Sequence, residues 1–185
     1  MKKYELTEET INVFGKTLHR IRATRDFSNV HAGDLGGFIE NELNLSHDRD
    51  TWVYGNAWAY GEARVYGNAL VSGDARVGGN ASVSGDARVG GNALVSGNAR
   101  VYGEARVKGP RDIYWISCIG SRDGTTSFFR NANNGISVSC GCFYGTIDEF
   151  AAAVTKTHGD NEHAQAYRHA IEIAKLRIKL EDAES

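Results

Sequence analysis

Two cysteines and two histidines in the C-terminal part of the chain have side chains that could bind a metal ion or react. Cys140 and Cys142 flank a glycine, and together with His158 and His163 they could bind zinc. A second closely spaced cysteine pair is missing, so we expect no metal. Alternate positions of one strand would instead place both thiols in a core beside small apolar side chains. A reactive thiol remains an alternative for this pair.

Two sets of basic side chains could bind an anion. Arg122 and Arg130 lie at the two ends of the segment GSRDGTTSFFR, and His158 could join them if that segment forms a hairpin. Arg20 and Arg22 are two residues apart, so both would project from one face of a strand. In each case a solvated surface is the alternative, and we expect no cofactor. No Ser–His–Asp arrangement is evident, so no catalytic residue is predicted.

The overall composition limits the class of partner. The chain has 185 residues, a formal net charge of −2 and 24% charged residues. This balance argues against wholesale coating of nucleic acid. No apolar run approaches the roughly 20 residues of a membrane span, and the start MKKYELTEET lacks the apolar part of a signal peptide. Three cysteines fit a reducing compartment, so we expect a cytoplasmic protein that does not contact a membrane.

An internal repeat dominates the middle of the sequence. From Val53 the chain reads VYGNAW, AYGEAR, VYGNAL, VSGDAR, VGGNAS, VSGDAR, VGGNAL, VSGNAR, VYGEAR, VKG. Valine and the preceding alanine are two residues apart, so both face the same side of an extended segment. The glycine and the following Asn, Asp or Glu favour a bend. Each unit of six residues is therefore predicted to form one short inward-facing strand and one corner.

These units resemble the hexapeptide repeats of left-handed parallel β-helix proteins. The resemblance implies three units per triangular coil, about three coils over residues 53–108, and frequent oligomerisation along the prism axis. Ile39, Leu45 and Thr51 share the spacing of the alanines, which indicates a degenerate first coil over 33–51. The fold class is therefore expected to be mainly β.

Stacking of such coils would align the outward residues in columns. One column would contain Trp58, Arg76 and Leu94, and it is the candidate contact face of a trimer or dimer. The alternative is a solvated, charge-balanced surface, because acidic residues occupy neighbouring corners. The other columns would be Arg64, Ser82, Arg100 and Leu70, Arg88, Arg106.

The best-known enzymes that carry hexapeptide repeats are acyltransferases, which use a histidine general base beside a loop that protrudes from a coil. Here the repeat has no such loop, and no histidine lies between His47 and His158. His47 is therefore a weak candidate base, and an acyltransferase is the second hypothesis for function.

The two ends of the chain are predicted to form separate modules. Residues 1–32 contain the strand-like segments KYELT, TINVF and TLHRIRAT and are expected to cap the repeat region, which covers 33–109. Residues 110–185 are predicted to form an α+β domain of order β-β-β-α-α. Its first helix would start at the capping box Thr146–Glu149, and Asp160 would cap the second.

The whole chain also resembles an uncharacterised type of protein from bacteriophage and prophage genomes, through GDLGGFIE and NLSHD before the repeats and SCGCF, DEF and HGDN after them. This resemblance implies an accessory protein inside a bacterial host cell. The leading hypothesis is a non-enzymatic binding protein, with the β-helix as a rigid oligomerising spacer and the terminal domains engaging a host protein or a small nucleotide, as in counter-defence. A structural phage component is the third hypothesis.

Overall fold

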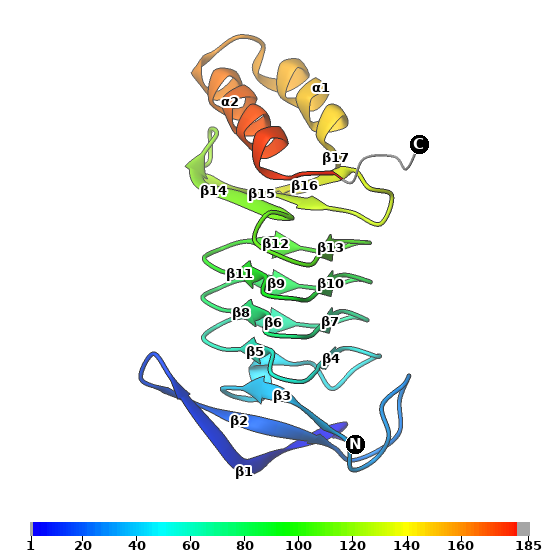
Figure 1. Cartoon of the computed structure of the whole chain (residues 1–185). Helices are drawn as coiled ribbons and strands as arrows, with labels where there is room; N and C mark the ends of the chain where they lie inside the picture. The colour runs from blue at the N-terminus through cyan, green and yellow to red at the C-terminus, as the bar shows by residue number, and fades with distance from the viewer. Residues whose placement is uncertain (1, 181–185) are drawn as a thin grey trace.

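The computed structural model describes residues 2–180 and places three modules one above another (Figure 1). A β-hairpin lies at the N-terminal end, a β-solenoid of about four turns forms the middle, and a sheet covered by two helices lies at the C-terminal end. The expected order of modules along the chain is therefore present.

The solenoid consists of two-residue strands that recur every six residues. Parallel pairing arranges them in three sheets, β3-β5-β8-β11, β4-β7-β10-β13 and β6-β9-β12. In each strand the second residue is buried, which confirms the predicted inward position of the valines. The first residue faces outward, except that Trp52 in β4 is buried against Tyr4 and Phe27. The strands are Trp52–Val53 (β4), Trp58–Ala59 (β5), Arg64–Val65 (β6), Leu70–Val71 (β7), Arg76–Val77 (β8), Ser82–Val83 (β9), Arg88–Val89 (β10), Leu94–Val95 (β11), Arg100–Val101 (β12) and Arg106–Val107 (β13).

Glycines form the corners between these strands, as the repeat predicts. Gly85 has φ of 67°, a left-handed conformation that other residues rarely adopt. A Cβ atom at this position would also lie 2.8 Å from the backbone nitrogen of Gly103 in the next turn. Glycine is therefore required here for two reasons, the backbone conformation and the close stacking of the corners.

The first turn is irregular and differs from the expected phase. Strand β3 (Leu35–Ile39) and a 3-10 helix, η1 (Glu42–Asn44), open it. Ile39 pairs with Ala59 and Leu45 with Val65, so both occupy the valine column rather than the predicted alanine column. The segment between Leu45 and Val53 contains two more residues than a regular unit, which causes the shift. Thr51 does keep the alanine position, because the next residue, Trp52, pairs with Leu70. The Thr51 hydroxyl donates to the carbonyl of Ala69.

The N-terminal segment forms two long antiparallel strands rather than three short ones. Strand β1 (Tyr4–Val13) contains an irregularity between Leu6 and Thr10 but continues through it, and β2 (Lys16–Ala23) follows after a tight turn. β2 also pairs with β3, so the hairpin extends one sheet of the solenoid. Tyr4 and Trp52 are buried together in the core at this end. The segment therefore caps the solenoid, as expected.

A four-stranded antiparallel sheet covers the opposite end of the solenoid. Its order is β14-β15-β16-β17, with bounds Ile113–Ile119, Gly124–Arg130, Ile136–Cys140 and Phe143–Thr146. The predicted third strand ends at Cys140 and turns back, so the module has order β-β-β-β-α-α. Adjacent residues of β15 face opposite sides of the sheet. Phe129 belongs to the core of the solenoid, and Phe128 belongs to the core under the helices.

Two helices, α1 (Ile147–His158) and α2 (Glu162–Arg177), cover the outer face of this sheet (Figure 1). The predicted capping box starts α1, since Thr146 and Glu149 bond to each other's backbone nitrogen. Gly159, with φ of 57°, ends it. Asn161 rather than the predicted Asp160 caps α2. No helix in residues 2–180 is long and apolar enough to cross a membrane.

Candidate ligand pocket

A cavity of about 490 Å³ lies between the outer face of the C-terminal sheet and the two helices. Most of its lining is apolar, a property that ligand pockets commonly share. The residues that line it are Ile119, Ser121, Arg122, Gly124, Cys140, Gly141, Cys142, Phe143, Phe150, Ala153, Val154, Thr157, His158 and Tyr167. The cavity is therefore built from the β14–β15 turn, the β16–β17 turn and both helices.

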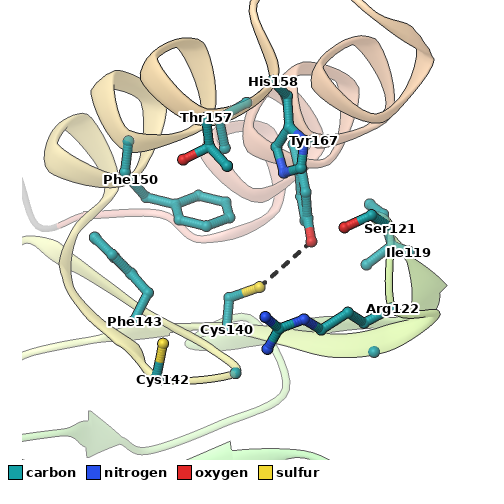
Figure 2. Close-up of a pocket in the computed structure, with 14 residues that line it drawn as sticks. Ile119, Ser121, Arg122, Cys140, Cys142, Phe143, Phe150, Thr157, His158 and Tyr167 are labelled. Atoms are coloured by element: carbon teal, nitrogen blue, oxygen red, sulfur yellow. Dashed lines mark hydrogen bonds between the residues drawn. The ribbon is translucent and has the colours of Figure 1, made fainter.

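Arg122 and His158 reach this cavity from opposite walls (Figure 2). Arg122 comes from the turn between β14 and β15, on the sheet side, whereas His158 is the last residue of α1. The sequence grouped these two side chains with Arg130 as a candidate anion site, and the structure brings Arg122 and His158, but not Arg130, to one cavity. Arg122 is exposed at the rim, so an acidic ligand would meet it without displacing protein atoms.

Cys140 and Tyr167 form a polar contact deep in the same cavity. The sulfur of Cys140 lies 3.6 Å from the Tyr167 hydroxyl, drawn as a dashed line in Figure 2, and it accepts a hydrogen bond of 3.1 Å from the Thr126 hydroxyl. Burial, followed by the contact with Cys140, raises the pKa of Tyr167, so its hydroxyl stays protonated. This hydroxyl can therefore donate a hydrogen bond.

The two cysteines do not share the environment that the sequence suggested. Cys140 ends strand β16 and is partly buried against the core under the helices, as expected. Cys142 instead lies in the two-residue turn before β17 and is exposed, so its assignment to the core was wrong. Within residues 2–180 no group of three or more His, Cys, Asp or Glu side chains is arranged to hold a metal ion.

The other predicted anion-binding arginines lie elsewhere and contact groups of their own chain. Arg130 is at the far end of β15, buried beside Asp112 with an N···O distance of 3.6 Å, and does not line the cavity. Arg20 lies 2.8 Å from a carboxylate oxygen of Glu9 and donates to the carbonyl of Gly36.

Arg22 binds the Glu5 carboxylate through Nε and a terminal nitrogen. The guanidinium groups of Arg20 and Arg22 are therefore each matched by a carboxylate of β1, and they do not converge on a shared anion site.

The predicted column of Trp58, Arg76 and Leu94 is present on one face of the solenoid. Arg76 pairs in register with both neighbours, and its guanidinium lies 4.5 Å from the centre of the Trp58 ring. Leu94 is 41% exposed. The face therefore carries an accessible apolar side chain beside a cation stacked on an aromatic ring.

His47 lies at the N-terminal end of the solenoid, packed on the cap. Its ring stacks on Tyr4 with centroids 4.2 Å apart, and its Nδ1 accepts a hydrogen bond from the backbone N–H of Lys3. Burial lowers the pKa of His47, although Glu42 acts in the opposite direction. These contacts fix the ring in the junction between hairpin and solenoid.

Several pocket residues were not identified from the sequence as binding residues. Tyr167 and Phe150 belong to the apolar faces of their helices, and part of each side chain lines the cavity. Helical periodicity detects a buried face, but it does not show that the packing leaves a space. Phe143 belongs to the strand that the sequence did not predict as separate.

The stacked parallel turns with inward valines define the class of this chain as a β-solenoid repeat protein with a folded module at each end. Residues 63–79 and 87–103 match the family model described as the YdcK beta solenoid repeat, so this part of the chain is similar to that family. No curated protein matches the chain.

Proposed function

We propose that this chain is a non-enzymatic binding protein whose C-terminal module holds a small acidic ligand with an apolar body. The cavity that contains both Arg122 and His158 is the observation that carries the proposal. The solenoid separates this module from the N-terminal hairpin and serves as a rigid spacer between them.

The distribution of side chains in the cavity supports this ligand class. Phe143, Phe150 and Val154 offer an apolar wall, and burying a ring or alkyl chain against them removes apolar surface from water. Arg122 offers a permanent positive charge at the rim, with donors arranged for a carboxylate or sulfonate. The Tyr167 hydroxyl adds a neutral donor in the interior, because its raised pKa keeps it protonated.

The fluorescent probe 8-anilinonaphthalene-1-sulfonate combines an aromatic body with one anionic group and can test this site. We expect saturable binding to the folded protein, with at least tenfold weaker binding by Arg122→Gln, which loses a charge-assisted contact. Arg177→Gln, at the exposed end of α2, is the matched control and should bind as the wild type does. Equal affinity in both variants would contradict the assignment.

The same proposal includes the handedness of the solenoid, its oligomeric state and its role in a host cell. The resemblance to hexapeptide-repeat proteins supports a left-handed β-helix, and the accessible Leu94 beside the Trp58–Arg76 stack supports an oligomer formed along that face. The resemblance to phage and prophage proteins supports a role in the cytoplasm of a bacterial host, where the ligand would be a host metabolite or a small nucleotide. Turnover of a ligand by the purified protein would refute the non-enzymatic part.

A further inference from the structure

One face of the solenoid departs from its own repeat. The first residue of the ten two-residue strands, β4 to β13, is Trp, Arg or Leu in nine of them. The exception is Ser82 in β9, which pairs in register with Arg64 on one side and Arg100 on the other. A short side chain between two long ones leaves a depression in the β6-β9-β12 face.

The neighbouring column repeats the same arrangement with aromatic residues. Tyr66, Ser84 and Tyr102 occupy the next position of the same three turns, so a serine again lies between two large side chains. Tyr66 is 45% exposed, whereas Tyr102 is held by packing against Tyr144 with ring centroids 4.6 Å apart. Elsewhere a tyrosine covers the small residue of the adjacent turn, as Tyr60 covers Gly78.

Two hollows adjoin on this face and together form what we call the serine notch. One, of about 400 Å³, is lined by Asn80, Ser84, Arg100 and Tyr102, and the other, of about 350 Å³, is lined by Arg64, Leu43, Ser46 and Val65; Tyr66 and Ser82 line both. The notch lies on the solenoid and shares no lining residue with the cavity in the C-terminal module.

The charges at the notch are available to a ligand. Arg64 and Arg100 are exposed, and neither forms an ion pair with another residue of the described range 2–180. Asp86 and Glu104 lie on the corner beyond the tyrosine column, but neither lines a hollow. The hydroxyl of Ser82 supplies a neutral donor between the two positive charges.

We propose that the serine notch binds a mononucleotide, with the phosphate between Arg64 and Arg100 and the base between Tyr66 and Tyr102. Stacked strands are about 4.8 Å apart, so residues two turns apart are separated by about 9.6 Å. A ring centred between two tyrosines would then lie about 4.8 Å from each, within the range of offset stacking. A phosphate centred between the arginines has room for a charge-assisted hydrogen bond to each.

Calorimetric titration of the full chain with adenosine 5′-monophosphate tests the proposal. We expect saturable binding that weakens as salt is raised, because two guanidinium groups contribute charge. Adenosine and inorganic phosphate, each lacking one half of the ligand, should bind at least tenfold more weakly. Absence of binding at millimolar nucleotide, or equal binding of adenosine, would overturn the proposal.

Two variants locate the binding at the notch. Ser82→Leu introduces the residue that the repeat carries at Leu70 and Leu94, so it should fold, fill the depression and abolish nucleotide binding. The double variant Arg64→Gln/Arg100→Gln should weaken binding at least tenfold, while Arg88→Gln, at the same position on another face, should not. Unchanged binding in either notch variant would overturn the proposal, and the result is independent of the C-terminal cavity.

Discussion

Lys3 is fully buried at the junction of the N-terminal hairpin and the solenoid. Its ammonium group donates to the carbonyl of Thr51 at 2.6 Å and lies 3.4 Å from the carbonyl oxygens of Asp48 and Arg49. It also lies 4.9 Å from the centre of the Phe27 ring. A single side chain thus ties the loop before β4 to the cap, at the cost of burying a charge.

This burial predicts a pH dependence of stability. Burial lowers the pKa of Lys3 from 10.5 to about 8, so between these values the unfolded chain binds more protons than the folded one. The free energy of unfolding should therefore gain a rising component above pH 8, by at most about 1.4 kcal/mol per pH unit. Urea unfolding between pH 7.5 and 9.5 measures it. Lys3→Met should lack this component, and parallel curves for the two proteins would contradict the prediction.

Gly120 determines the position of the Tyr167 hydroxyl in the pocket. It has φ of 76°, and a Cβ atom there would collide with that hydroxyl. We expect Gly120→Ala to displace Tyr167, to cost about 1–3 kcal/mol through backbone strain, and to weaken binding of the anilinonaphthalene probe. Gly15→Ala, with φ of 77° and nothing within 4 Å of the added Cβ, is the control, because it carries similar backbone strain but does not line the pocket. Similar losses in both variants, measured by urea unfolding and fluorescence titration, would show that the contact is unimportant.

Some residues of the pocket could be predicted from the sequence, and others could not. Arg122 and His158 could be paired from their types and from the predicted hairpin and helix end. Arg130 could not be separated from them, because its distance from the cavity depends on where β15 crosses the end of the solenoid. Cys142 is exposed because it lies in a two-residue turn, and the sequence SCGCF resembles one continuous strand, so this turn was not predicted.

At the scale of single elements, the turn of the solenoid depends on its glycine corners. We expect Gly85→Ala to lower the free energy of unfolding by more than Gly141→Ala does. Both residues have positive φ, near 67° and 59°, so both variants carry backbone strain. At Gly85 the added Cβ would also contact Gly103, whereas nothing lies within 4 Å at Gly141.

Urea unfolding of the two variants provides the measurement. The strain common to both is about 1–3 kcal/mol, and the excess in Gly85→Ala reports the stacking of adjacent corners. An equal loss of stability in the two variants would mean that the corners relax to accept a side chain.

The regular elements were predictable because their signal repeats. Valine at every sixth residue and alanine two before it place a buried column independently of any other module. The first turn does not follow the six-residue repeat. Because two extra residues precede Val53, Ile39 and Leu45 lie in the valine column and not in the alanine column. Periodicity within 33–51 was too short to reveal this change.

At the scale of the whole molecule, one apolar core runs from the N-terminal cap through the solenoid to the C-terminal sheet. Tyr4, the column of valines and Phe129 belong to this single cluster, while a second cluster lies under the helices. Both ends of the solenoid are thereby covered, which protects strand edges from pairing with other chains.

An oligomer formed along the Trp58–Arg76–Leu94 face should depend on Leu94. We expect Leu94→Glu to shift the assembly to monomer, because it introduces a charge into an apolar contact. Light scattering coupled to size-exclusion chromatography measures the mass. Leu70→Glu, at the same position on another face, should leave the assembly intact. A wild-type protein that is monomeric at high concentration would refute the assembly.

Hydrogen bonds between corners join residues 18 apart, and each regular turn presents the same strand edges as the one before it. Duplicating or deleting one such block would leave the two ends of the solenoid with their partners. The hairpin and the pocket would then move apart or together by about 4.8 Å. The length of the solenoid can thus change in fixed steps of one turn, by insertion or deletion, while the modules at its two ends keep their own contacts.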